Sequence, residues 1–271
     1  MTEENDMEYF DITMTATLRP ELIQRTVQSF HENLWGYWLD FARIYVNVDE
    51  AGCEEEDECL VKYMRIVEYL TGFFGKERVT FNYKKPHFPS AWFWCVNQTK
   101  SRLVFHLEED WELNYPVSFE RMWGIFYRYP KLKHLRLSIF KSSDKSIKMW
   151  QRFFALWNGE FFQIEEKAVG PVGVCGHPSL NDGEWLRAAA AKMSPDRNPE
   201  KQFHYNSPEF MKEFVLENDF GLYQPQNKHP ALKEIGRQWM KDHGYKKAGG
   251  VNCEWFTHWV KQGEEAYGKT N

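Results

Sequence analysis

The chain has 271 residues, of which 42% are hydrophobic and 17% aromatic, and its formal net charge is −5 at pH 7. That length allows one large α/β domain with a substantial core, and the negative charge excludes a global field that attracts nucleic acid. No run approaches the ~20 apolar residues of a membrane span, and the acidic start lacks a signal-peptide core. We therefore expect a soluble, cytoplasmic protein without membrane contact.

The cysteines are five in number and show no CxxC spacing. An odd number without such a motif is typical of free thiols in a reducing compartment, and it argues against a disulfide framework or a zinc site. We expect all of them to be free, namely Cys53, Cys59, Cys95, Cys175 and Cys253.

The first half of the chain alternates strand-like and helix-like segments. Alternating or apolar runs predict strands at 8–16, 43–48, 78–83 and 102–107, and helical spacing predicts helices at 21–34, 53–70 and 90–100. The acidic run 54–58 is interpreted as a negative first turn that favours the helix dipole. This β-α-β-α-β-α-β order predicts an α/β fold with a mostly parallel central sheet and helices on both faces.

The second half is less regular. A strand is predicted at 134–140 and a helix at 185–193, on either side of an aromatic stretch and a loop rich in Gly and Pro. Asn198-Pro199-Glu200 and Ser207-Pro208-Glu209 each combine a capping residue, a proline and an acid, which predicts two helix starts.

Three consecutive carboxylates follow the strand 102–107. Glu108, Glu109 and Asp110 repel one another unless a positive charge lies between them. Asp49 also follows a predicted strand, and ligands of open α/β sheets bind beyond the carboxyl ends of the strands. Oxygen ligands suit Mg²⁺ or Mn²⁺. Two interpretations stay open from the residues alone, a solvated acidic turn and a divalent-cation site.

A resemblance to a known family rests on four features. These are the turn Thr15-Ala16-Thr17-Leu18-Arg19-Pro20-Glu21, the acid at Asp49, Ala91 and Asn97 on the helix before the fourth strand, and the segment HLEEDW that contains Glu108-Glu109-Asp110. Together they resemble family 2-like, nucleotide-sugar-dependent glycosyltransferases of the GT-A fold, and HLEEDW is similar to the form found in small bacteriophage-type enzymes. The usual motif is Asp-x-Asp, so Glu108 departs from it while Asp110 is kept.

The resemblance implies a single GT-A (Rossmann-like) domain with an irregular C-terminal acceptor region. Residues 1–115 would be its nucleotide-sugar-binding half, and 116–271 its acceptor-binding half with a C-terminal helical tail. It also implies a hexosyl- or pentosyltransferase in the cytoplasm, or in the host cytoplasm if a phage encodes the chain.

The site residues implied by the resemblance fall into two groups. The donor, for which a UDP-sugar is expected, would contact Thr15, Thr17, Arg19, Asp49, Ala91, Asn97, Glu108, Glu109 and Trp111. A Mn²⁺ or Mg²⁺ ion would be held by Asp110, with Glu108 and His258 as further candidate ligands. Such an ion stabilises the departing nucleoside diphosphate.

An inverting enzyme also needs a base that deprotonates the acceptor hydroxyl. Asp182 and Glu200 are equal candidates. Asp182 could instead cap a helix, and Glu209 shares the setting of Glu200, so helix-start chemistry is an alternative for both. A retaining enzyme would need no such base.

The acceptor is suggested by a basic block within this acidic chain. Its members are Arg128, Lys131, Lys133, Arg136, Lys141, Lys145, Lys148 and Arg152. With the aromatic residues among them they indicate either a nucleic-acid surface or a solvated basic face. One acceptor is then a hydroxymethylated pyrimidine in phage DNA, flipped out of the stack. The alternatives are a surface polysaccharide or other glycan, and an inactive module that binds nucleotide sugars or carbohydrate.

Overall fold

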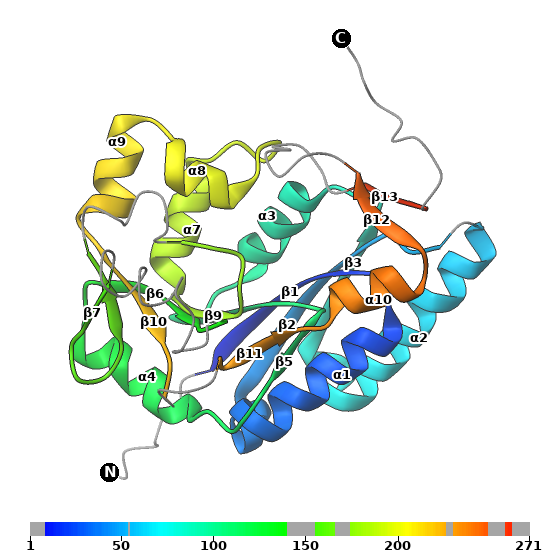
Figure 1. Cartoon of the computed structure of the whole chain (residues 1–271), viewed down its shortest axis with the longest axis horizontal. Coiled ribbons are helices and arrows are strands. Elements are labelled where there is room, and N and C mark those ends of the chain that lie inside the picture. The colour runs from blue at the N-terminus through cyan, green and yellow to red at the C-terminus, as the bar shows by residue number, and fades with distance from the viewer. Residues whose placement is uncertain are drawn as a thin grey trace.

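The computed structural model describes residues 9–53, 55–139, 155–165, 174–225, 230–248 and 258–261. They form an α/β domain built on a central sheet (Figure 1). Within the described residues the sheet has nine strands, in the spatial order β3 (Val79–Lys84), β2 (Ala42–Asp49), β1 (Phe10–Thr17), β4 (Leu103–Glu108), β9 (Ser179–Asp182), β6 (Leu132–Leu137), β10 (Asp219–Tyr223), β8 (Phe162–Ile164) and β7 (Ala155–Trp157).

The first four strands of the chain, β1 to β4, are all parallel. β1 pairs in parallel with both β2 and β4, and β2 pairs in parallel with β3. β9 runs antiparallel between β4 and β6, and β8 runs antiparallel between β10 and the edge strand β7. The predicted mostly parallel sheet is confirmed, and its antiparallel strands come from the second half of the chain.

Helices cover both faces of the sheet (Figure 1). One face packs against α1 (Pro20–Phe30), α2 (Glu56–Phe74) and α4 (Phe119–Arg128). The other packs against α3 (Phe88–Gln98), α7 (Gly183–Ala191), α8 (Pro199–Tyr205) and α9 (Pro208–Met211).

The remaining C-terminal elements return to the first half of the domain. β11 (Leu232–Glu234) pairs with β5 (Trp111–Leu113), and α10 (Gly236–Asp242) follows it directly. β12 (Tyr245–Ala248) then pairs with β13 (His258–Lys261).

The helix starts follow the local signals in the sequence. Glu56, Asp57 and Glu58 form the first turn of α2, where carboxylates favour the helix dipole. Asn198 Oδ1 accepts a hydrogen bond of 2.9 Å from Glu200 N, and the Ser207 hydroxyl oxygen accepts one of 3.3 Å from Phe210 N. The predicted helix starts are confirmed.

The two faces of the sheet differ sharply in polarity, because alternate residues of one strand point to opposite faces. Phe10, Ile12 and Met14 of β1 face α1 and α2, as do Phe105 and Leu107 of β4. The intervening residues Asp11, Thr13, Thr15 and Thr17, with Asn47, Asp49, His106, Glu108, Ser179, Asn181, His134 and Arg136, face the other side. We call these two surfaces the apolar face and the polar face.

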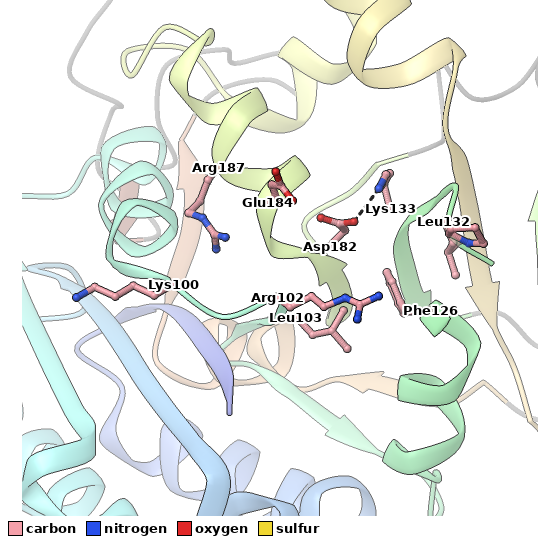
Figure 2. Close-up of a pocket in the computed structure, with 10 residues that line it drawn as sticks. Lys100, Arg102, Leu103, Phe126, Leu132, Lys133, Asp182, Glu184 and Arg187 are labelled. Carbon is pink, nitrogen blue, oxygen red and sulfur yellow. Dashed lines mark hydrogen bonds and ion pairs between the residues drawn. The ribbon is translucent and has the colours of Figure 1, made fainter. Parts of the chain in front are cut away.

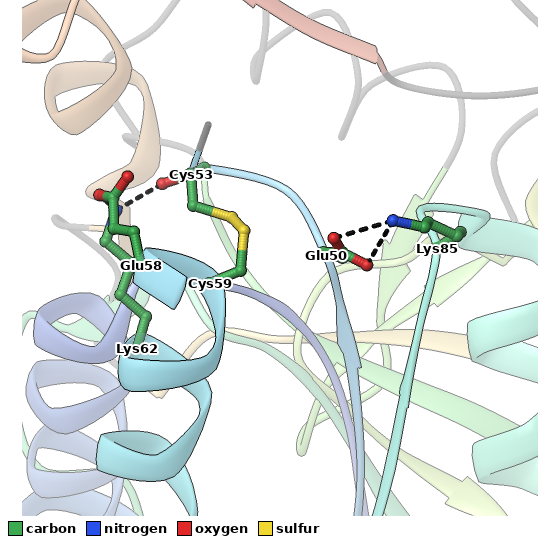
Figure 3. The surroundings of a disulfide bond; sticks show 7 residues. Glu50, Cys53, Glu58, Cys59, Lys62 and Lys85 are labelled. Atoms are coloured by element: carbon green, nitrogen blue, oxygen red, sulfur yellow. Dashed lines mark hydrogen bonds and ion pairs between the residues drawn. A yellow bond between two sulfur atoms is a disulfide. The ribbon is translucent and has the colours of Figure 1, made fainter. Parts of the chain in front are cut away.

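The prediction that every cysteine is free is wrong for one pair. Cys53 and Cys59 form a disulfide across six positions of sequence, joining the loop after β2 to the first turn of α2 (Figure 3). The spacing matches no short motif, so only the return of the chain at this turn reveals the pair. Cys95 and Cys175 are free and buried, and Cys253 lies outside the described residues. Within the part of the chain that the structure describes, no helix is long and apolar enough to cross a membrane.

Candidate functional site

The strand register brings the predicted donor residues to one edge of the sheet. Thr17 at the end of β1 lies opposite Asp49 at the end of β2, and Thr15 lies opposite Glu108 at the end of β4. Because all three strands are parallel, their carboxyl ends meet there. Residues that are 92 positions apart in sequence, such as Thr17 and Glu109, thereby come into direct contact.

Glu109 organises the turn after β1. Its Oε1 accepts hydrogen bonds from the backbone N (3.0 Å) and hydroxyl (2.8 Å) of Thr17, and it forms an ion pair with the Arg19 guanidinium. Arg19 also reaches Asp110 Oδ2 at 3.3 Å, and the exposed fraction of its side chain is only 3%. A buried cation thus holds two of the three consecutive carboxylates, with Glu109 turned towards the β1 turn.

Glu108 and Asp110 are the carboxylates whose environment disfavours two negative charges. Burial and the neighbouring Asp110 raise the pKa of Glu108 to about 8, although the Trp111 indole N–H donates to Glu108 Oε2 at 3.2 Å. Trp111 is itself buried, and its ring lies 5.1 Å from that of His177. A divalent cation between the two carboxylates would relieve this repulsion. The oxygen ligands that Glu108 and Asp110 offer therefore fit a hard metal ion.

Asp49 anchors the other side of the edge. Its Oδ1 accepts from Asn47 Nδ2 at 2.8 Å and its Oδ2 from His87 N at 3.1 Å, which ties the end of β2 to the start of α3. Burial raises the pKa of Asp49 to about 6, against the opposing effect of the Asn47 hydrogen bond.

Of the two α3 residues expected at the donor, only one lies near this edge. Ala91 is buried in the part of α3 that begins beside Asp49. Asn97 is exposed in the last turn, about 9 Å further along the helix axis at 1.5 Å per residue.

The two candidate bases lie in different places. Asp182 pairs with Leu103 at the amino end of β4, about 17 Å along the strand from Glu108. It caps α7 by accepting from Trp185 N at 2.9 Å, and it forms an ion pair of 2.7 Å with Lys133. Both residues line a cleft of about 700 Å³ at this end of the sheet, shown in Figure 2. The structure therefore does not bring Asp182 together with the donor residues.

Glu200 lies in the first turn of α8, on the polar face. Burial and the nearby Cys175 raise the pKa of its carboxyl, opposed by His177, Lys201 and Arg136. Cys175 and His177 belong to a segment beside Glu108, because a Cβ placed on the intervening Gly176 would lie 3.5 Å from Glu108 Oε1. Glu200 is thus linked through this segment to the carboxyl-end edge.

Sequence reasoning missed the polar cluster around Glu200. Burial opposes ionisation of the Cys175 thiol, but Arg136 and His177 outweigh it and hold its pKa well below the ordinary value. Cys175 in turn raises the pKa of His177 against the effect of burial. No motif marks these residues, since Arg136 comes from β6 and the other two from a loop.

The basic block is not one continuous surface within the described residues. Arg136 is buried on the polar face, Lys133 pairs with Asp182, and Arg128 pairs with Glu160 at 2.6 Å. Its members from Lys141 to Arg152 lie outside the described residues.

His258, the remaining candidate ligand, begins β13, where its backbone pairs with Ala248. Among the described residues, no group of three or more His, Cys, Asp or Glu side chains is arranged to hold a metal ion. Mg²⁺ commonly uses only one or two carboxylates together with substrate phosphates, so a site of that kind needs no such group of three.

No protein-family model and no curated protein sequence match the chain. Solved structures of glycosyltransferases do match its fold. The mannosyltransferase PcManGT from Pyrobaculum calidifontis, in complex with GDP-Man and Mn²⁺, has a TM-score of 0.52 at 10% identity, over 80% of this chain and 55% of that one. S. aureus TarS 1–349 in complex with UDP-GlcNAc has a TM-score of 0.52 at 9% identity, over 80% and 56%.

These similarities establish the fold. The chain has the GT-A-like fold of nucleotide-sugar glycosyltransferases, as its sequence predicts. It spans a little over half the length of PcManGT and 35% of the length of the longer TarS chain, which has a TM-score of 0.50 at 6% identity over 80% of this chain.

Proposed function

We propose that this chain is a metal-dependent glycosyltransferase that moves a sugar from a nucleoside diphosphate sugar to an acceptor hydroxyl. The observation that carries the proposal is the convergence of Thr17, Asp49 and the Glu108–Trp111 segment at the carboxyl ends of β1, β2 and β4. This is where open α/β sheets bind nucleotides. GDP-Man and UDP-GlcNAc occupy the similar structures, and a UDP-sugar is our expected donor.

The chain's own residues would divide the work of donor binding. Asp110 and Glu108 would hold a Mn²⁺ or Mg²⁺ ion, which when bound offsets the charge of the leaving diphosphate. Asp49 would accept hydrogen bonds from the base or ribose, since its carboxylate is held in place by Asn47 and His87. Arg19 would keep Asp110 in position through its ion pair.

Glu200 is our proposed base for an inverting transfer. It lies near Cys175 and His177, beside the metal motif, whereas Asp182 is committed to a helix cap and to Lys133 at the other end of β4. A raised pKa suits a group that takes a proton near neutral pH. In this role Glu200 would accept the proton of the acceptor hydroxyl as the bond to the sugar forms.

For the acceptor we propose a hydroxymethylated pyrimidine in DNA, with hexose or pentose transfer both open. The support is the similarity of HLEEDW to bacteriophage-type glycosyltransferases and the basic residues at 141–152. A glycan acceptor is the alternative within the same reaction class.

The test is release of nucleoside diphosphate from a panel of nucleotide sugars with Mn²⁺, with and without DNA that contains hydroxymethylcytosine. We expect release that needs the metal, is stimulated by the modified DNA and is lost in Asp110→Ala. The matched control is Glu112→Ala, which removes a carboxylate two residues away that pairs with Arg25. Release that a glycan but not DNA stimulates would move the acceptor to carbohydrate. Metal-dependent binding of nucleotide sugars without release under any condition would indicate a binding module that has lost transfer.

A further inference from the structure

The start of α10 lies directly against the Asp110 carboxylate. A Cβ placed on Gly236 would lie 2.1 Å from Asp110 Oδ2 and 2.8 Å from the Asp110 Cβ and Cγ atoms. Contacts under 3.0 Å are essentially never seen for real Cβ atoms, so residue 236 cannot carry a side chain while Asp110 keeps this conformation. Gly236 is also not one of the glycines with positive φ. The contact with Asp110, and not a backbone requirement, therefore explains the glycine.

Residue 236 cannot easily withdraw, because its neighbours fix the backbone. β11 pairs with β5 up to the register Glu234 to Trp111, next to Asp110 in sequence. The backbone N of Ile235 then donates a hydrogen bond of 2.8 Å to the carbonyl oxygen of Asp110. Ile235 is buried against Leu22 of α1. The strand pairing, the hydrogen bond and the packing of Ile235 therefore hold the backbone of Gly236 against Asp110.

The same helix also reaches Asp110 through Arg19. The Arg19 Cζ atom lies 5.5 Å from the centre of the Trp239 ring, one turn after Gly236. The Trp239 indole N–H donates to Glu21 Oε1, which holds the ring over the guanidinium. Arg19 in turn pairs with Asp110 Oδ2 at 3.3 Å. α10 therefore contacts the candidate metal ligand directly and covers its ion-pair partner.

We propose that α10 is a positioning element of the donor site, in which the bare backbone of Gly236 fixes the side-chain conformation in which Asp110 binds the divalent cation. The inference rests on the metal-binding role of Asp110 proposed above. Gly236 would touch neither the cation nor the donor, so it acts only through Asp110. Changes to groups that orient a metal ligand typically weaken metal affinity by about 10–100-fold.

The first test is calorimetric titration of Mn²⁺ in the presence of saturating UDP. We expect Gly236→Ala to weaken Mn²⁺ binding at least about tenfold. The matched control is Gly72→Ala in α2, where an added Cβ meets nothing within 4 Å, and we expect wild-type affinity from it. Asp110→Asn separates the two claims. If Asp110→Asn leaves the affinity unchanged, the metal role itself is wrong. If only Gly236→Ala leaves it unchanged, the positioning role is wrong.

The second test needs no metal and is a double-mutant cycle in thermal unfolding. Asp110→Gly removes all three of the nearest atoms that a Cβ at position 236 would meet, including the Asp110 Cβ at 2.8 Å. We therefore expect the fall in Tm caused by Gly236→Ala to be at least halved in the Asp110→Gly background. A double variant that folds where Gly236→Ala alone does not would give the same support. An equal fall in both backgrounds, or failure of both to fold, would place the strain elsewhere and overturn the proposal.

Discussion

The apolar and polar faces of the sheet are made by alternate residues of the same strands, yet they are built for different purposes. On the apolar face, β1 and β4 bury only hydrocarbon and aromatic side chains against α1, α2 and α4. On the polar face the same strands bury Asp11, Thr13, Thr15 and His106. Burying polar groups lowers stability unless they are paired, and His106 Nε2 and Thr15 Oγ1 have no hydrogen-bond partner among the described residues. The difference teaches that these strands place their candidate chemistry on one face only, while α3, α7, α8 and α9 supply most of the apolar packing of that face.

The largest effect that would sharpen this comparison is on activity. Glu200→Gln keeps the size of the side chain and removes the base, so we expect transfer to fall by about 10²–10⁴-fold. Mn²⁺-dependent nucleotide binding should be unchanged, because Glu200 lies on α8 and outside the donor edge. The comparison variant is Asp182→Asn, which keeps an oxygen that can cap α7, and we expect it to stay within about threefold of wild type. A larger loss of transfer in Asp182→Asn than in Glu200→Gln would indicate that the base is Asp182, at the amino end of β4, and would contradict the role of Glu200.

Substitutions at two adjacent residues of β4 show how much each face contributes to the free energy of unfolding. Phe105 is fully buried on the apolar face and packs against Phe30, Trp35 and Phe119. We expect Phe105→Ala to lower the free energy of unfolding by about 3–5 kcal/mol. His106→Leu removes a buried imidazole whose Nε2 has no hydrogen-bond partner among the described residues. It also leaves the buried Thr13 hydroxyl without the His106 Nδ1 atom 3.0 Å away, so we expect a smaller loss of about 1–2 kcal/mol. Urea unfolding of both variants measures the difference, and an equal loss in the two would remove the distinction between the faces.

The smallest effect is a pH-dependent one at Asp49. Burial raises its pKa from 3.8 to about 6, so the folded state binds a proton more readily than the unfolded state. The ionised carboxylate therefore lowers stability above pH 6, and this cost disappears as the pH falls from about 6 towards 4. Two pKa units correspond to about 3 kcal/mol, which is the cost of the ionised Asp49 carboxylate that Asp49→Asn removes. The substitution also loses one hydrogen bond, at about 1 kcal/mol.

We thus expect Asp49→Asn to raise the free energy of unfolding by about 1–2 kcal/mol at pH 8 and to leave it nearly unchanged at pH 4.5, where the remaining ionisation cost of about 1 kcal/mol cancels the lost hydrogen bond. Urea unfolding at the two pH values measures this difference. A stabilisation of the same size at both would show that ionisation of Asp49 is not the cause.

The sequence was sufficient for the fold and for one edge of the site. Alternation in 43–48 and apolar runs at 8–16 and 102–107 predict the parallel strands, and the helix starts at Asn198 and Ser207 are read from local capping chemistry. Thr17, Asp49 and Glu108 could be placed together because the carboxyl ends of neighbouring parallel strands share an edge.

What the sequence could not supply depends on long-range packing. The antiparallel insertion of β9 sends Asp182 to the far end of β4, a placement that no local pattern encodes. The Cys53–Cys59 disulfide needs the return of the chain at the first turn of α2. Gly236 and Trp239 reach Asp110 and Arg19 from more than 120 residues away, through a short strand pair that has no clear sequence signal.

The most direct test of the central claim is a crystal structure with UDP and Mn²⁺, in which anomalous scattering locates the ion. We expect the nucleotide at the carboxyl ends of β1, β2 and β4, with its base or ribose at Asp49 and the ion between its diphosphate and Asp110. Nucleotide bound in the cleft lined by Lys133 and Asp182 would contradict a metal-dependent glycosyltransferase site at the carboxyl ends of these strands. Nucleotide bound at the carboxyl ends with no ion at Asp110 would contradict it as well.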